Sequence, residues 1–544
     1  MRASSFFLLI LTFNGVFADS RSAVEYEQLV RSADTLANLE KAVSIYNQNG
    51  DVWRRLGSAR YDAKKFAEAI EAHKMALKLG GFENKFFANT HFDIACCLAR
   101  LGKTADAFKE LEIAMSLGFR DLNQVQKDTD LDPLHSDKRW PALSGTDDVT
   151  KMSRDDAWRY DARLMVREAQ RIHYDPFIHF PKKEQEIWLK TIQRDIPKMN
   201  DNEIKIAFMK YMVRLGDGHT GIRTAEPEKN PILPLQLYWF EEGIYVIAAS
   251  KDHGELVGRK VTRVAGHDIM ELMKAVEPTI WRDNPQGIRS AAPSRATQPW
   301  VLNGLGFLTD LSGADVTTIG DSGDSKTVFV QAKVGQPDAT WVNWLERRES
   351  PLYLQNRAKP YHLVTLPELG AVYVQYNSVR NDPAEVLSEF SSRLTDTLKS
   401  TNAQRLIVDV RFNGGGNTFL SRPLVSAIIT NPVINKRGHL FVITGRQTFS
   451  AAQNFTTDLG RAAEVIYVGE PTGSSPNFVG ETVRFTLPYS KMQGSISDLY
   501  WQRSWPMDSR IWIAPDLPAP PTFAAFKANI DPAMDAIREY IGKG

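Results

Sequence analysis

The C-terminal part of the chain alternates short apolar runs, rich in β-branched residues, with helical stretches. Four runs have the length and composition of buried strands, at residues 371–376, 405–410, 439–443 and 464–469. Helical patterns lie between them, for example at 383–400 and 451–463. Strands that alternate with helices form largely parallel sheets covered by helices. This region is therefore predicted to be α/β, with ligand chemistry at the carboxyl ends of its strands.

The rest of the chain predicts other kinds of structure. At about 150 residues per domain, 544 residues allow three or four domains. Hydrophobic residues make up 43% and charged residues 24%, which are ordinary globular values. We expect a multidomain α/β protein with these divisions: helical repeats at 23–120, a linker or cap at 121–152, a helical segment at 153–228, a small β module at 229–340 and an α/β core at 341–544.

The predicted helical repeats resemble tetratricopeptide hairpins. Large and small packing residues such as Trp53 and Gly57 stand at positions typical of that repeat, and matching residues recur from Ile94 to Ala114. Stacked hairpins leave a concave face on which a protein partner can bind, and shielding of the next domain is an equal alternative. Cys96 and Cys97 lie in one of these helices, where we expect buried packing thiols.

Charge and cysteine usage narrow the functional classes. With 66 Lys and Arg against 65 Asp and Glu, the net charge is +1, so no overall field attracts nucleic acid or an anionic membrane. Adjacent cysteines rarely reach the geometry of a disulfide. There is no His-Glu-x-x-His string and no Cys/His cluster, so we expect no metal and no cofactor.

The N-terminus predicts export. Arg2 precedes an apolar run from Phe6 to Phe13, and small residues at Val16 and Ala18 fit a signal peptide at 1–18 that is cleaved after Ala18. A span needs about 20 apolar residues, so this run favours a signal over a membrane anchor, although an uncleaved anchor remains the alternative. We expect a secreted or periplasmic protein with no stable membrane span after cleavage.

Ser450 is the most informative single residue. It follows a predicted strand and begins a predicted helix. There, unpaired N–H groups and the positive end of the helix dipole favour a developing oxyanion, and the N–H of Ala451 is one such donor. Serine is also a common helix cap, and the local string alone favours that interpretation.

Two further loops strengthen the catalytic interpretation. Three glycines, Gly414, Gly415 and Gly416, follow the strand that ends near Asp409, and they let backbone N–H groups approach a ligand closely. His219 lies between glycines in Gly218-His219-Thr220-Gly221, a turn context that allows it to point into a cleft. A turn histidine is more often simply solvated, so neither loop is decisive alone.

Together these strings resemble the tail-specific, or C-terminal-processing, serine peptidase family, and more closely its tricorn-like branch. The resemblance runs from about residue 153 to the C-terminus. It implies a crotonase/ClpP-like peptidase core and a PDZ-like module near 235–264. It also implies Ser450 as nucleophile, with an oxyanion hole formed by Gly415, or a neighbouring glycine, and Ala451. Asp409 and Arg411 are then a structural pair that braces the glycine loop.

The general base follows from a departure from the family pattern. The processing-protease branch has a lysine in the stretch that matches 472–477, and this chain has none there. The tricorn-like branch uses a histidine, which His219 matches, and imidazole titrates near neutrality. Asp508 stands near the position of the branch's acidic third residue. An ordinary surface aspartate is at least as good an interpretation of Asp508. The branch's serine before the histidine is Gly218 here.

We therefore expect an exported serine peptidase that acts on peptides or proteins through an acyl-enzyme. The alternative is a catalytically inactive peptidase-fold protein that binds peptides or apolar ligands, because fold does not determine function. A third possibility is that the helical repeats are the main functional surface. Substrate specificity and oligomeric state have no signal in the sequence.

Overall fold

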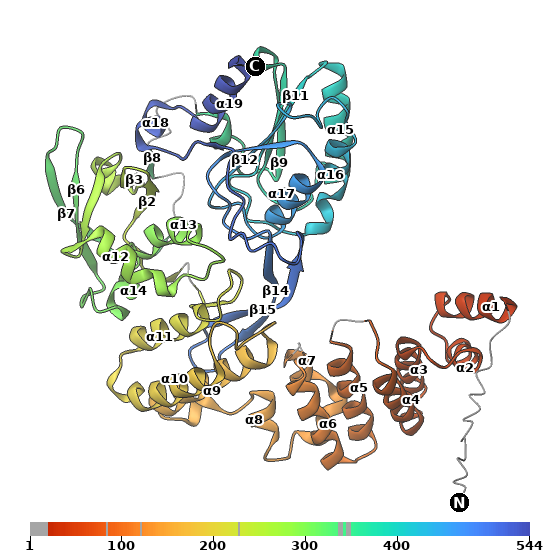
Figure 1. Cartoon of the computed structure of the whole chain (residues 1–544). Helices are drawn as coiled ribbons and strands as arrows, with labels where there is room; N and C mark the ends of the chain where they lie inside the picture. Colours follow the sequence, from red (N-terminus) through yellow and green to blue (C-terminus); the bar gives the residue numbers. More distant parts are fainter. Residues whose placement is uncertain are drawn as a thin grey trace, which may run out of the picture. The chain divides into compact units, whose positions relative to one another are not determined.

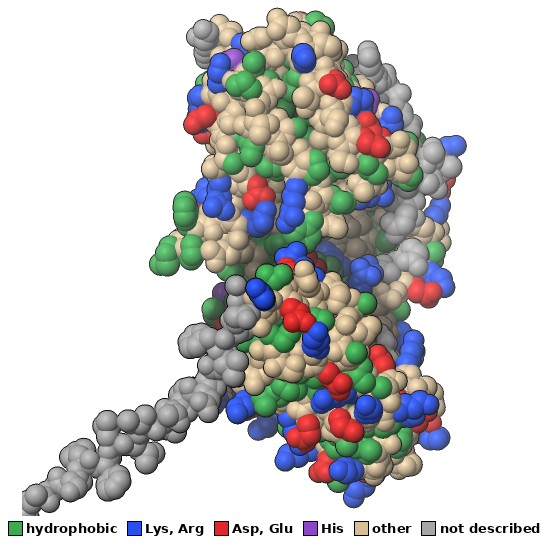
Figure 2. Space-filling model, turned by 90° about the vertical axis from the view of Figure 1, so that its right-hand side faces the viewer, with side chains coloured by type: hydrophobic (Ala, Val, Ile, Leu, Met, Phe, Trp, Pro, Cys, Tyr) green, Lys and Arg blue, Asp and Glu red, His purple; other side chains and the backbone are tan. Residues whose placement is uncertain are grey.

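The chain divides into two compact units, Met1–Asp148 and Val149–Gly544. A computed structural model describes residues 20–82, 85–119, 122–226, 229–335, 341–343 and 350–543 (Figure 1). The predicted signal peptide lies outside these residues. Within them, no helix is long and apolar enough to cross a membrane. On the face in Figure 2, basic and acidic side chains are interspersed, in keeping with the nearly neutral net charge.

The first unit is entirely helical within its described residues. Its six longer helices are α1 (Ser20–Arg31), α2 (Leu36–Ile45), α3 (Gly50–Asp62), α4 (Phe66–Leu79), α5 (Phe86–Arg100) and α6 (Thr104–Ser116). Helix α3 packs on α4 and α5 packs on α6. A Cβ at Gly57 would lie 2.4 Å from the ring of His73, so this contact requires glycine. The predicted helices are present, and their assignment to tetratricopeptide repeats stays a prediction.

The segment predicted as a cap closes the core of this unit. It forms the short helices α7 (Leu122–Lys127) and α8 (Trp140–Ser144) with a 3-10 turn, η1 (Thr129–Leu134), between them. Val125, Leu131 and Trp140 join the same buried cluster as Cys96 and Cys97. Both thiols are free and buried, as expected of packing residues, and burial raises the pKa of Cys97 to about 12.

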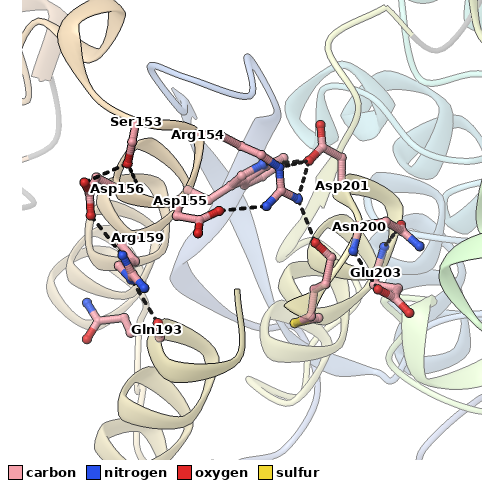
Figure 3. A network of polar contacts seen from close by, with 11 residues as sticks. Ser153, Arg154, Asp155, Asp156, Arg159, Gln193, Asn200, Asp201 and Glu203 are labelled. Carbon is pink, nitrogen blue, oxygen red and sulfur yellow. Dashed lines mark hydrogen bonds and ion pairs between the residues drawn. The ribbon is translucent and has the colours of Figure 1, made fainter. Parts of the chain in front are cut away.

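The second unit begins with three helices, α9 (Arg154–Ile172), α10 (Lys182–Asp195) and α11 (Asp201–Val213). Ser153 caps α9, and Asn200 and Glu203 form a reciprocal capping box on α11. Arg154 joins the two helix starts, because its guanidinium binds Asp201 at 2.7 Å (Figure 3). These contacts hold α9 and α11 together, and the His219 loop follows α11 directly.

The β module is an antiparallel sheet with strand order β2-β3-β4-β6-β7. Its strands are β2 (Leu235–Phe240), β3 (Gly243–Ala249), β4 (Lys260–Val264), β6 (Gly313–Ile319) and β7 (Ser325–Gln331), with the short β5 (His267–Asp268) and β8 (Val342–Asn343) at its side. Helices α12 (Ile269–Val276), α13 (Gln286–Arg295) and α14 (Pro299–Gly304) lie between β5 and β6. The three predicted strands are confirmed. Because β8 pairs with β3, the sheet extends beyond the predicted limit of residue 340. The PDZ-like assignment stays a prediction.

The core is a six-stranded sheet with order β16-β13-β12-β11-β10-β9. All neighbours are parallel except β9 on β10. The strands are β9 (Tyr361–Leu366), β10 (Ala371–Tyr376), β11 (Arg405–Asp409), β12 (Leu440–Thr444), β13 (Val465–Gly469) and β16 (Leu517–Pro518). The predicted parallel α/β core is therefore confirmed.

Helices cover both faces of this sheet. The apolar cluster on one face contains side chains of α15 (Leu387–Ser400), α16 (Arg422–Ile429) and α17 (Ala451–Ala462). The cluster on the other face contains side chains of α19 (Pro532–Lys543). The short helix α18 (Phe523–Ala528) packs Phe523 and Phe526 against Phe240 of the β module. This contact joins the module to the core within the second unit.

A long two-stranded ribbon was not predicted. It consists of β14 (Asn477–Thr486) and β15 (Gln493–Gln502), and β1 (Gly221–Arg223) pairs with it through Gly221 and Ser495. The ribbon leaves the core after β13 and meets the chain just past His219. It therefore brings the N-terminal part of this unit to the carboxyl ends of the core strands.

Candidate active site

The structure brings Ser450 and His219 together. Ser450 follows β12 at the start of α17, and His219 lies in the loop between α11 and β1. The distance from Nε2 of His219 to Oγ of Ser450 is 3.0 Å, although 231 positions separate the residues in sequence. A hydrogen bond of this length is what a general base needs to take a proton from a hydroxyl nucleophile.

The backbone of Ser450 is held in an unusual conformation. Its φ is 55° and its ψ is −124°, in a region that non-glycine residues seldom occupy. Its side chain makes no capping hydrogen bond to α17. The interpretation of Ser450 as a simple helix cap is therefore wrong, because its hydroxyl is directed at His219.

The ring of His219 lies between two aromatic rings. Phe449 stacks on it at 4.6 Å between centroids and Phe478 at 5.6 Å. Burial lowers the pKa of His219, while the nearby Asp217 and the backbone of Val479 act in the opposite direction. The imidazole is therefore neutral near pH 7 and able to accept a proton. Its Nδ1 is buried, and no side chain among the described residues makes a hydrogen bond to it.

Asp217 holds the loop that carries His219. Its Oδ1 accepts the N–H groups of His219 at 2.8 Å and Thr220 at 2.7 Å and the hydroxyl of Ser497 on β15. Its other oxygen lies 2.8 Å from Nε2 of His173. Burial alone would raise the pKa of Asp217, but these hydrogen bonds keep it below the ordinary value. The charged carboxylate of Asp217 thus holds the backbone of the His219 loop in place through these hydrogen bonds.

Asp283 occupies the place next to Gly218. One oxygen accepts the N–H of Gly218 at 2.6 Å, and the other accepts the hydroxyl of Ser474. A Cβ at Gly218 would lie 2.7 Å from that carboxylate and from the ring of Phe449, so a serine does not fit there. Burial raises the pKa of Asp283 to about 7. In this chain a carboxyl group from the β module therefore fills the space beside the histidine loop.

The glycine loop packs directly on Ser450. Gly415 has a φ of 105°, and a Cβ there would lie 2.7 Å from Cβ of Ser450 and 2.9 Å from the nitrogen of Ala451. A Cβ at Gly416 would lie 2.2 Å from the carbonyl oxygen of Val379, whereas Gly414 faces open space. The loop's close approach thus depends on Gly415 and Gly416.

The two predicted oxyanion donors, the N–H groups of Ala451 and Gly415, differ in whether they are already hydrogen-bonded. Ala451 is the first residue of α17, so its N–H has no acceptor within the helix. The N–H of Gly415 donates to the side-chain oxygen of Asn413 at 2.9 Å. Gly415 can serve an oxyanion only if that bond is shared or released, whereas the geometry leaves Ala451 available.

Asp409 and Arg411 act as the predicted brace. The guanidinium of Arg411 binds Asp409 at 2.8 Å and, with two hydrogen bonds of 2.9 Å, Asp531. The hydroxyl of Tyr373 also donates to Asp409. This buried network lies at the base of the glycine loop, and Asp531 is a member that the sequence did not reveal.

The structure does not join Asp508 to His219. Both carboxylate oxygens of Asp508 accept hydrogen bonds from Arg510, which lower its pKa. Within the described part of the chain, no carboxylate bonds to Nδ1 of His219, the atom to which an orienting carboxylate would bind. The prediction of Asp508 as the third residue is therefore corrected, because Asp508 forms an ion pair with Arg510 instead. Asp217 accepts a hydrogen bond from the backbone of His219 but not from its ring.

A cavity of about 280 Å³ opens beside the pair. Gly414, Phe449 and Gly473 of the core line it together with Gly218 of the histidine loop, and Trp281 and Ala291 line it on the side of the β module. It has room for a side chain of a bound peptide next to Ser450.

One group of side chains in the described residues has the spacing of metal ligands. It consists of Cys96, Asp128 and Asp130 in the first unit. Burial raises the pKa of the Cys96 thiol well above its ordinary value, which disfavours the thiolate that binds metals. This group does not include any residue of the candidate active site.

Several supporting residues escaped the sequence interpretation. Asp217 had one available signal, since it stands two residues before His219 in a glycine-rich turn. His173, Asp283, Phe478 and Ser497 come from four other segments, and no local string marks them. Their role depends on tertiary contacts.

Among solved structures, mature CPAF supports this fold. Mature CPAF complexed with lactacystin superposes with a TM-score of 0.51 at 13% identity, covering 72% of this chain and 97% of that one. The photosystem II D1 C-terminal processing protease has a TM-score of 0.37 at 12% identity over 72% and 98%. The tricorn protease has a TM-score of 0.35 at 14% identity over 72% and 37%. No curated protein matches the sequence.

A family model described as peptidase family S41 matches residues 370–485, a segment that contains the glycine loop and Ser450. The predicted resemblance to the tail-specific peptidases is thereby confirmed, and within this segment the chain is similar to peptidase family S41.

Proposed function

We propose that this protein is an exported serine peptidase in which Ser450 is the nucleophile and His219 is the general base. The observation that carries the proposal is the 3.0 Å hydrogen bond between Nε2 of His219 and Oγ of Ser450. The match of residues 370–485 to peptidase family S41 supports this reaction class. The proposed export rests on the N-terminal sequence pattern alone.

The proposed reaction is a two-step acyl transfer. Oγ of Ser450 attacks the peptide carbonyl carbon while Nε2 of His219 accepts the hydroxyl proton. The N–H of Ala451 and the glycine loop stabilise the negative charge on the carbonyl oxygen. His219 then gives its proton to the leaving amine. Water, activated by the same ring, hydrolyses the ester and regenerates Ser450.

A lysine base has no support at this site. The stretch 472–477 contains no lysine, and its Ser474 donates instead to Asp283. The nearest later lysine, Lys491, is exposed at the far end of the β14–β15 ribbon. A lysine must be strongly desolvated to act as a base near neutrality, and an exposed one is not.

Peptide hydrolysis and labelling by a fluorophosphonate probe test this proposal together. We expect Ser450→Ala to abolish both and His219→Ala to lower both by a factor on the order of 10⁴ or more. Ser426→Ala, which changes an exposed serine on α16, is the matched control and should leave both unchanged. Full activity in either site variant would refute the assignment.

One observation favours the alternative of a binding protein on a peptidase scaffold. No side chain among the described residues bonds to Nδ1 of His219, so none fixes the orientation of the ring. Such a protein would bind peptides or apolar ligands without turnover, and Ser450→Ala would leave that binding unchanged. The same assays therefore separate the two candidates.

A further inference from the structure

A second cavity, of about 430 Å³, lies between edge strand β2 and helix α13 of the β module. Residues of β2 line one side, and Ser290, Ser294 and Arg295 of α13 line another. It reaches the core at Arg446 and Gln447, in the turn that leads to Ser450.

The lining of this cavity is strongly basic. Four arginines contribute to it, Arg223, Arg289, Arg295 and Arg446, and no aspartate or glutamate is among its described lining residues. This contrasts with the whole chain, in which acidic and basic residues balance. A concave site with one sign of charge concentrates the field and attracts ligands of the opposite sign.

Two of the four arginines are already neutralised. Arg289 binds Glu241 at 2.5 Å, and Arg446 binds Glu470 at 2.5 Å. Both carboxylates lie outside the cavity lining. These two arginines therefore shape the wall of the cavity and add little net charge to it.

The other two lack an acidic partner among the described residues. Arg295 contacts the amide oxygen of Gln298 at 3.5 Å, and its guanidinium lies 5.7 Å from the centre of the Trp281 ring. Within the described residues, the hydrogen bond of the Arg223 guanidinium is to the amide oxygen of Gln493, at 3.1 Å. Burial lowers the pKa of Arg295 to about 10, so it stays charged at neutral pH. A desolvated arginine without a carboxylate costs stability, which is expected where a ligand supplies the missing charge.

The cavity is placed to hold part of a chain that reaches Ser450. Ser290, Arg446 and Gln447 line both this cavity and the smaller one beside the Ser450–His219 pair. A peptide with one segment in the arginine-lined cavity can therefore continue past Gln447 toward the nucleophile.

We propose that the arginine-lined cavity binds an acidic segment of the peptide substrate, with Asp or Glu side chains paired to Arg295 and Arg223. The proposal builds on the proposed peptidase, since it names the substrate class of that site. Two unpaired cations from different elements, β1 and α13, match a segment with more than one carboxylate better than a single chain end.

Binding to the full chain with Ser450→Ala tests this without any need for turnover. The probe is a fluorescein-labelled peptide with a Glu-rich segment, compared by anisotropy with the same peptide carrying Gln at those positions. We expect the Glu peptide to bind about tenfold more tightly or better, and the difference to shrink as salt rises. Arg295→Gln should remove most of the preference, and Arg295→Lys should keep part of it.

Three controls distinguish an effect of the cavity arginines from the loss of any arginine, from misfolding and from binding of the peptide's C-terminal carboxylate. Arg263→Gln changes an exposed arginine of the same module that does not line the cavity, and it should leave the preference intact. If Arg295→Gln does not fold, Arg223→Gln at the exposed rim gives the same reading. Equal affinity for the two peptides overturns the proposal. So does a preference that depends only on the peptide's C-terminal carboxylate, shown by its loss on amidation.

The acidic-segment proposal and the proposed peptidase function can be refuted separately. Loss of peptidase activity in every assay, with the acidic preference intact, would contradict the peptidase and keep the binding site. Normal peptidase activity with no acidic preference would do the reverse.

Discussion

Ser450 and His219 face each other from regions that are built differently. Ser450 stands on the parallel core sheet, and its surroundings come from three neighbouring strand ends. His219 stands in a loop outside the matched family segment, and residues from α9, the β module and the β14–β15 ribbon hold it. The nucleophile thus depends on local backbone geometry, whereas the base depends on distant contacts.

This difference decides which substitutions are severe. On the nucleophile side, steric fit of the glycine loop is the main requirement. On the base side, buried hydrogen bonds that Asp217 and Asp283 accept from the loop backbone set the position of the histidine loop. Substitutions on one side at a time therefore test whether the positions of Ser450 and His219 are set independently of each other.

The largest effect is expected on the base side, from Asp217→Ala. It leaves His173, Ser497 and two backbone N–H groups without their buried acceptor. Loss of a buried charged partner costs about 3–5 kcal/mol, so thermal unfolding of the chain should shift sharply downward and fluorophosphonate labelling should be lost. Asp396→Asn on the exposed face of α15 is the control. An unchanged unfolding temperature would show that Asp217 does not support the loop.

On the nucleophile side, Gly415→Ala should reduce peptide hydrolysis by about 10²–10³-fold. The new Cβ would collide with Ser450 and Ala451, and the φ of 105° disfavours alanine. Gly414→Ala is a closely matched comparison, because nothing lies within 4 Å of its Cβ. Equal activity of the two variants would contradict the requirement for close packing on Ser450.

A smaller effect, on stability against pH, is expected from Asp283→Asn. The pKa of Asp283 is raised to about 7, so the folded chain holds this proton more tightly than the unfolded chain does. Its contribution to stability is full below about pH 4 and declines as pH rises to about 7. Asparagine can bond to both Gly218 and Ser474 without ionising.

The variant should therefore lose this decline and gain on the order of 4 kcal/mol at pH 8 relative to the parent chain. Thermal unfolding measured from pH 5 to pH 8 checks it. Parallel curves for the two proteins would mean that Asp283 titrates as an ordinary carboxyl group.

The smallest effect is expected from Asp508→Asn. Asp508 pairs with Arg510 and makes no hydrogen bond to His219 among the described contacts, so its charge has no direct part in the proton transfer. Peptide hydrolysis should change by less than about twofold. A loss comparable to that of His219→Ala would restore Asp508 as the residue that orients the base.

The contrast between the two sides also explains what could be predicted from sequence. The strand–turn–helix around Ser450 and the glycine loop are local, so the core strands and the brace of Asp409 and Arg411 were predictable. His219 was identified by a short turn string and the resemblance to a family. The supports of that loop, Asp283 among them, approach from distant segments, and spacing carries no trace of such contacts. Asp508 was misplaced because position along the chain does not show that Arg510 takes its carboxylate.

The account's central claim is that His219, with a pKa lowered by burial, activates Ser450. The most direct measurement is the rate of fluorophosphonate labelling, mapped to Ser450 by mass spectrometry, as a function of pH. Because the reactive form has a neutral imidazole, we predict that the rate rises with pH through one apparent pKa below the ordinary histidine value of about 6.5 and then stays level. We also predict that His219→Ala removes this rise. Labelling that is independent of His219, or that rises only at alkaline pH as with a lysine base, would contradict the claim.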